Sequence, residues 1–165
     1  MLMTGKTKEL IRWLLEQPEE KEWEVKEHKQ RRSLNANAYF HVLCQRIAEA
    51  THQSLTAVKN QLLADYGQID ADMGTVILRD DIDWKSIQYM HLLPTSATRT
   101  LDDGKLYRVY WVVRGSHTYD TKEMSRLIEG AVTEAKELDI ETMTPDQLKR
   151  MMAAWKPRRE EDETL

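Results

Sequence analysis

The sequence predicts an α+β domain in which helices pack on a small, mostly antiparallel sheet. Apolar residues recur at three- and four-residue spacing in both the N-terminal and the C-terminal parts of the chain. The middle, residues 74–114, is instead rich in β-branched and aromatic residues and contains an Asp-Asp-Gly turn. At 165 residues the chain is long enough for one domain with a hydrophobic core. We predict that this domain spans residues 1–156. The charged residues 157–165 offer nothing to a core and are expected to form a disordered tail.

The N-terminal part is predicted to contain three helices and one edge strand. A helix is expected over residues 7–16, and weak alternation over residues 23–30 indicates the edge strand. Ser33 can accept hydrogen bonds from the first free amides of the next long helix and is its predicted N-cap. Ser54 is predicted to cap a third helix, which ends at Gly67.

The middle of the chain is predicted to form the sheet. A β-branched run over residues 75–78 and an apolar run over residues 87–93 favour extended backbone. The turn Asp102-Asp103-Gly104 joins residues 98–101 and 105–113 into a hairpin. The second of these strands alternates clearly, with Tyr107, Val109, Trp111 and Val113 on one face and Arg108, Tyr110, Val112 and Arg114 on the other.

Two helix starts follow with strong local chemistry. Asp120 and Glu123 have the spacing of a capping box, and Thr144 precedes a proline at the first helical position. Between them runs an apolar seam of seven residues: Met124, Leu127, Ile128, Ala131, Val132, Ala135 and Leu138. The seam is expected either to pack on the β-rich middle or to form part of a homodimer interface.

Composition limits the classes of function. The net charge of −4 excludes a uniformly basic nucleic-acid binder, although a local basic surface is compatible with it. No apolar run approaches the length of a membrane span and no signal peptide is visible, so we expect a cytoplasmic protein. Cys44 is the single cysteine, which excludes an internal disulfide, and its apolar neighbours predict a buried side chain.

A zinc site is not expected from the histidines and the cysteine. His28, His41, Cys44 and His52 lie near one another in sequence, but they lack the paired, tight spacing that structural zinc requires. We therefore predict no metal and no cofactor.

An acidic cluster leaves an enzymatic alternative open. Asp80, Asp81 and Asp83, with Asp70 and Asp72 upstream, could hold magnesium as nuclease carboxylates do. A metal-dependent nuclease is thus one alternative. A protein-only adaptor, whose acidic C-terminal part meets a basic partner, is another.

Two short motifs resemble a known family. The first motif is Arg32-Ser33-Leu34 with Asn37 three residues on, and it is similar to the Arg-Ser-Leu-x-x-Asn sequence that begins a helix in that family. The second motif is Ser116-His117-Thr118 followed by Glu123-Met124. With a tryptophan-containing helix near the end of the chain, here Trp155, these resemble the phage recombination-mediator family typified by NinB, also called Orf. The resemblance covers residues 32–50 and 112–156.

The resemblance implies a dimeric, non-enzymatic protein that binds single-stranded DNA in a bacterial host. Family members assist the loading of a strand-exchange recombinase, in contact with the host single-strand-binding protein, and no cofactor or hydrolytic activity is implied. On this hypothesis cationic side chains contact phosphates and one aromatic ring stacks on a base. The predicted DNA-binding residues are Lys29, Arg31 and Arg32 at the start of the helix, and Arg99, Arg108, Tyr110 and Arg114 on the hairpin.

Overall fold

The computed structural model describes residues 6–25 and 35–155, and the chain divides into two compact units between Ser33 and Leu34. The first unit contains helix α1 (Thr7–Leu15), in which no side chain is fully buried. Trp13 of this helix contacts Trp23 edge to face, with ring centroids 4.8 Å apart. Placing both units in one domain over 1–156 stays a prediction.

The second unit contains the remaining helices and the sheet. Its elements are α2 (Ala36–Thr51), α3 (Leu55–Tyr66), β1 (Thr75–Arg79), η1 (Trp84–Ser86), β2 (His91–Thr100), β3 (Leu106–Val113), η2 (Ser116–Thr118), α4 (Thr121–Glu137) and α5 (Pro145–Ala153). The described parts of the chain therefore form an α+β fold with five α-helices and one three-stranded antiparallel sheet of order β1-β3-β2. None of the helices in these parts is long and apolar enough to cross a membrane.

Local capping chemistry sets the helix starts. Ser54, Asp120 and Thr144 each accept a hydrogen bond from a first-turn amide, as predicted, and the last two complete capping boxes. The prediction of Ser33 as the cap of α2 is wrong, because Asn35 takes that position and accepts from the Ala38 amide at 2.8 Å. Asn35 is as good a cap as serine, so the pattern alone did not separate them.

The expected edge strand over 23–30 is not found where the structure describes it. Residues 23–25 have no strand pairing, and residues 26–30 lie outside the described residues, as does the predicted tail at 157–165. The hairpin is confirmed, because Thr98 faces Arg108 and Thr100 faces Leu106 in an antiparallel register.

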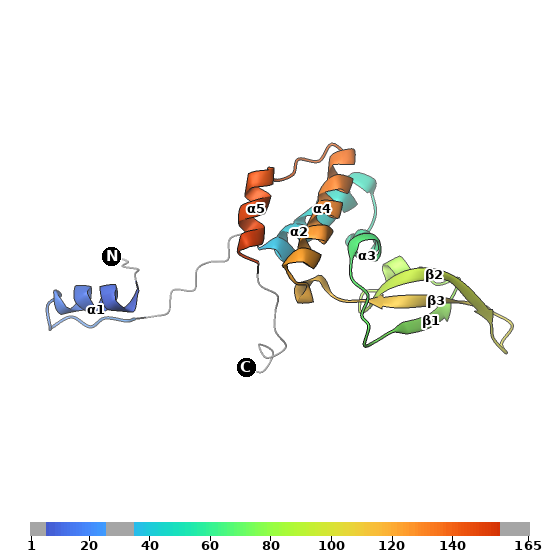
Figure 1. The fold of residues 1–165 in the computed structure, drawn as a ribbon, viewed down its shortest axis with the longest axis horizontal. Helices are drawn as coiled ribbons and strands as arrows, with labels where there is room; N and C mark the ends of the chain where they lie inside the picture. Colours follow the sequence, from blue (N-terminus) through green and yellow to red (C-terminus); the bar gives the residue numbers. More distant parts are fainter. Residues whose placement is uncertain (1–5, 26–34, 156–165) are drawn as a thin grey trace. The chain divides into compact units, whose positions relative to one another are not determined.

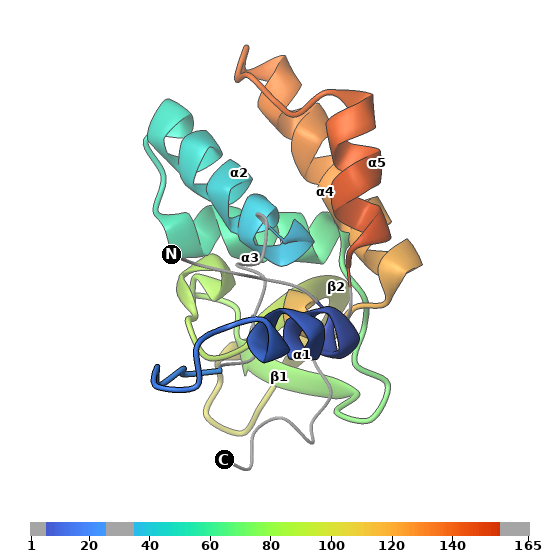
Figure 2. The same ribbon diagram turned by 90° about the vertical axis from the view of Figure 1, so that its left-hand side faces the viewer.

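Two hydrophobic clusters hold the second unit together. The larger one joins α2, α3, α4 and α5, and the smaller one lies between one face of the sheet and the η1 segment. Helix α4 packs beside α2 and α3 (Figures 1 and 2), and its seam from Met124 to Ala135 is buried within the protomer. The seam is therefore a core element against helices. Its predicted contact with the β-rich middle is confirmed only in part, through Val113 and Leu93 of the sheet, and its use in a dimer interface stays a prediction.

Candidate nucleic-acid interface

One face of the sheet is covered, and the other is open over part of its length. Directly opposed residues of an antiparallel pair share a face, so the strand register assigns every side chain. We call the covered face the inner face; it carries Val76, Leu78, Leu92, Arg108, Tyr110 and Val112. We call the other face the outer face. It carries Ile77, Arg79, Arg99, Tyr107, Val109 and Trp111, and at its far end Val113, which is buried against the helices.

Tyr110 belongs to the inner face and is buried. Its side chain is 2% exposed and packs in the smaller cluster, with the Trp84 ring centroid 6.5 Å away. The segment between β1 and β2 covers this face with apolar side chains, among them Trp84 and Ile87. The prediction that Tyr110 stacks on a base is therefore wrong, because its ring has no free surface.

Two of the predicted DNA-binding arginines are engaged within the protein. Arg108 Nε donates to Asp80 Oδ1 at 2.6 Å, and an Nη atom donates to the Thr95 carbonyl at 2.8 Å. The guanidinium of Arg114 lies 2.6 Å from Glu123 Oε1 and stacks over the Tyr119 ring. Both guanidinium groups therefore already have partners within the protein, and neither is free to bind a phosphate.

Lys29, Arg31 and Arg32 lie outside the described residues. Arg99 is placed differently from Arg108 and Arg114, because it faces Tyr107 on the outer face. Its side chain is exposed and makes no hydrogen bond or ion pair among the residues that the structure describes.

The outer face combines cations with aromatic rings. Arg79, Tyr107 and Arg99 are aligned across the three strands, because both arginines face Tyr107 in the register. Trp111 lies further along the same face of β3 and is 39% exposed, and Ile77 is 44% exposed. Guanidinium groups beside accessible rings are the elements of single-strand recognition, in which phosphates meet cations and bases stack on aromatic side chains.

Strand alternation separated the two faces but could not say which one faces solvent. The predicted site used the face of β3 that carries Arg108, Tyr110 and Arg114. Three apolar residues far from β3 in sequence, Trp84, Ile87 and Met90, cover this face. Only the register of the neighbouring strands brings Arg79 and Arg99 beside Tyr107.

The acidic cluster does not converge on one point. Asp81 pairs with Arg79 through both carboxylate oxygens, Asp80 pairs with Arg108, and Asp83 accepts from the Lys85 amide at the start of η1. Asp70 is engaged in its own turn, where it accepts from the amides of residues 72 and 73. Because these carboxylates have different partners, the geometry gives no support to the nuclease alternative.

The Cys44 thiol is unsuited to metal binding. Its side chain is fully buried, as predicted, and burial raises its pKa to about 12. Zinc binds the thiolate, which this environment disfavours. Among the described residues no group of three or more His, Cys, Asp or Glu side chains could hold a metal ion.

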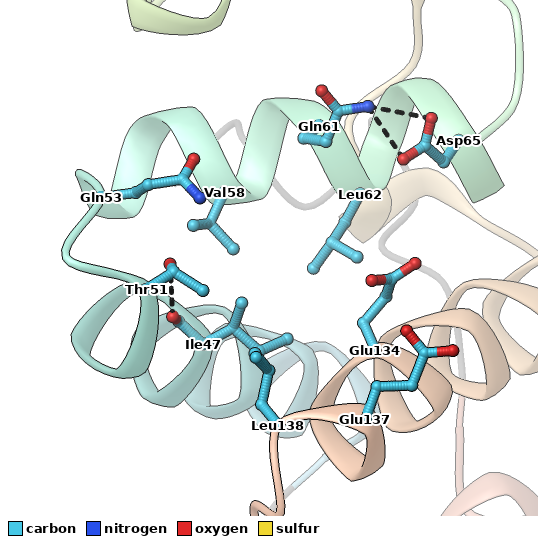
Figure 3. Close-up of a pocket in the computed structure, with 10 residues that line it drawn as sticks. All are labelled: Ile47, Thr51, Gln53, Val58, Gln61, Leu62, Asp65, Glu134, Glu137 and Leu138. Atoms are coloured by element: carbon cyan, nitrogen blue, oxygen red, sulfur yellow. Dashed lines mark hydrogen bonds between the residues drawn. The ribbon is translucent and has the colours of Figure 1, made fainter.

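A pocket of about 190 Å³ lies between α2, α3 and α4. Aliphatic side chains from the three helices, including Ile47, Leu62 and Leu138, converge in it (Figure 3). Its rim carries Asp65, to which Gln61 donates, and Glu134, to which the Tyr66 hydroxyl donates at 2.8 Å. Carboxylates repel phosphate, so this pocket is a poor site for nucleic acid.

One described residue of each motif of the family resemblance meets the other in the structure. Ser116 Oγ donates to Asn37 Oδ1 at 2.6 Å, and Ser116 is 4% exposed. This contact ties the start of α2 to the segment that leads from the sheet into α4. Asn37 and Ser116 are 79 residues apart, so their contact is a tertiary feature.

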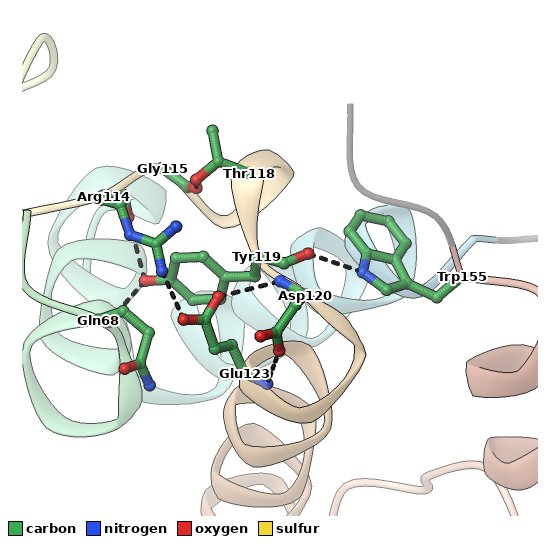
Figure 4. A network of polar contacts seen from close by, with 8 residues as sticks. All are labelled: Gln68, Arg114, Gly115, Thr118, Tyr119, Asp120, Glu123 and Trp155. Atoms are coloured by element: carbon green, nitrogen blue, oxygen red, sulfur yellow. Dashed lines mark hydrogen bonds and ion pairs between the residues drawn. The ribbon is translucent and has the colours of Figure 1, made fainter. Parts of the chain in front are cut away.

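Tyr119 organises the segment that joins the sheet to α4 (Figure 4). Its hydroxyl accepts from the Gln68 amide at 2.9 Å and donates to the Arg114 carbonyl at 3.0 Å, while its own carbonyl accepts from Trp155 Nε1 at 2.9 Å. A Cβ at Gly67 would lie 2.7 Å from the Tyr119 hydroxyl, so Gly67 is needed for this close approach. Gly67 is the C-cap of α3, as predicted, and its backbone there is extended.

His91 is partly buried and is hydrogen-bonded to Asn60. Asn60 Nδ2 donates to the carbonyls of Lys85 and Ile87, so Asn60 Oδ1 is left to accept from His91 Nδ1 at 2.8 Å. Burial is the main reason that the pKa of His91 is lowered to about 4, and the nearby Lys59, His117 and His41 lower it further.

The lowered pKa of His91 predicts acid sensitivity. In the unfolded chain the histidine takes up its proton at about pH 6.5, whereas in the folded protein His91 takes it up only at about pH 4. The free energy of unfolding should therefore fall as the pH falls between these two values. Allowing for solvent screening at this part-exposed site, we expect a loss of about 1–2 kcal/mol. Urea unfolding at several pH values in this range measures it. His91→Gln keeps a donor but does not titrate, and should flatten the profile; an unchanged profile would contradict the assignment.

Comparison of the chain with protein-family models, with curated proteins and with solved structures finds no match.

Proposed function

We propose that this protein binds single-stranded DNA on the outer face of its sheet. The alignment of Arg79, Tyr107 and Arg99 across three strands, with Trp111 exposed on the same face, is the observation that carries the proposal. Such a surface reads no base edges, so binding is without sequence preference. The resemblance to the NinB family supports the wider role: a homodimeric phage recombination mediator that assists recombinase loading with the host single-strand-binding protein, in the bacterial cytoplasm.

Fluorescence anisotropy with labelled oligothymidylate and a duplex control tests the proposal. We expect tight, salt-sensitive binding to the single strand and weak binding to the duplex, without cleavage when magnesium is added. Absence of binding at low salt would overturn the proposal and leave the protein-only adaptor.

Trp111→Ala should weaken single-strand binding by about tenfold or more, since stacking contributes about 1–3 kcal/mol per base. Tyr89→Ala is the matched control, because Tyr89 is an aromatic residue that is 89% exposed and lies on no strand. Arg99→Ala should weaken binding to all sequences and reduce the salt slope by about 0.7. Equal affinities of the Trp111→Ala and Tyr89→Ala variants would place the site elsewhere.

A further inference from the structure

The cations of the sheet are largely held by the protein's own carboxylates. Arg79 Nε and an Nη atom donate to the two oxygens of Asp81, each at 2.8 Å. Two parallel hydrogen bonds from one guanidinium are also the way in which arginine binds a phosphate. Asp81 therefore occupies the donor edge of Arg79 that a DNA phosphate would use.

A second carboxylate holds the tyrosine between the two arginines. The Tyr107 hydroxyl donates to Asp103 Oδ2 at 2.8 Å, and Asp103 Oδ1 accepts from the Lys105 amide at 3.0 Å. The backbone bond keeps Asp103 in place in the hairpin turn and is the main reason that its pKa is lowered. Asp103 therefore stays charged beside the outer face at neutral pH.

The contact between Arg79 and Asp81 is open to exchange. The Asp81 side chain is 64% exposed and that of Arg79 is 38% exposed, and the two residues are only two positions apart in sequence. Ion pairs in water are weak and screened by salt, so another anion can replace the carboxylate at little cost. Arg99 has no such partner among the described residues and is available from the start.

We propose that Asp81 is an internal competitor of DNA: in the free protein it occupies Arg79, and a phosphate of the single strand displaces it. Arg99 makes the first contact, and Arg79 follows by exchanging a carboxylate for a phosphate. This inference rests on the proposed function of the outer face.

The test compares Asp81→Asn with Asp102→Asn in the anisotropy assay with labelled oligothymidylate. Both variants remove one negative charge from an exposed loop at the sheet, but Asp102 makes no hydrogen bond or ion pair among the described residues. Asp81→Asn should tighten binding about threefold to fivefold because it frees Arg79, whereas Asp102→Asn should change the affinity by less than about twofold.

A double-mutant cycle isolates the exchange. In the Arg79→Ala background, Asp81→Asn should no longer tighten binding, because there is no guanidinium to release. Equal gains from Asp81→Asn and Asp102→Asn, or a gain that persists without Arg79, would overturn the competitor role while leaving the DNA-binding face intact. A complete lack of binding by the wild type and all variants would overturn both. Circular dichroism verifies that each variant is folded.

Discussion

Replacing Asn60 with aspartate is expected to destabilise the protein by about 3–5 kcal/mol. Asn60 is 1% exposed, and its amide nitrogen donates to the carbonyls of Lys85 and Ile87 at 2.8 and 2.7 Å. Aspartate has the same shape but no donor, so a carboxylate oxygen would face two carbonyl oxygens in a buried site. Protonation of His91 would recover only part of this loss, because both carbonyls would still lack a donor.

Urea unfolding followed by circular dichroism measures the effect. Asn35→Asp is the matched control, since it is the same chemical change at the N-cap of α2, where the side chain only accepts a hydrogen bond. Aspartate caps a helix as well as asparagine does, so this control should stay within about 0.5 kcal/mol of the wild type. A loss below about 1 kcal/mol in Asn60→Asp would show that the buried carbonyls find other donors.

Trp155→Ala is expected to cost about 3–5 kcal/mol, because it removes a large buried side chain and one buried hydrogen bond. Trp155 is 8% exposed in the helical cluster, and its indole donates to the Tyr119 carbonyl. The variant should loosen α5 from the rest of the second unit and leave that carbonyl without its donor.

Trp111→Ala provides the reciprocal control. Trp111 is 39% exposed, so its replacement should change the free energy of unfolding by less than about 1 kcal/mol while weakening DNA binding. Trp155→Phe should be intermediate in stability, because it keeps a ring but loses the indole donor. Similar unfolding free energies for Trp155→Ala and Trp111→Ala would contradict the structural distinction between the two tryptophans.

The helices and the hairpin could be predicted because their signals are local. Ser54, Asp120 and Thr144 cap helices through bonds to amides three residues away, and the Asp-Asp-Gly turn separates strands that pair directly. The error at Ser33 has the same origin, since two capping residues, Ser33 and Asn35, lie two positions apart.

The candidate site could be predicted only in part. Arg99 is exposed, but it lies on the outer face and not beside Arg108 and Tyr110 as predicted, and its neighbours there, Tyr107 and Trp111, were missed. Tyr110 was chosen because it alternates with arginines on β3, and the structure buries it. Alternation divides the strand into two faces, but the segment around Trp84 decides which face is covered.

The sequence by itself determined the α+β class, most helix bounds and caps, the hairpin, and the burial of Cys44, because these follow from periodicity and contacts between near neighbours. Only the tertiary structure decided which sheet face is open, that Asn60 binds carbonyls 25 and 27 residues away, and that Ser116 meets Asn37. These features depend on contacts between residues far apart in the chain, and such contacts arise only once the helices and the sheet have packed.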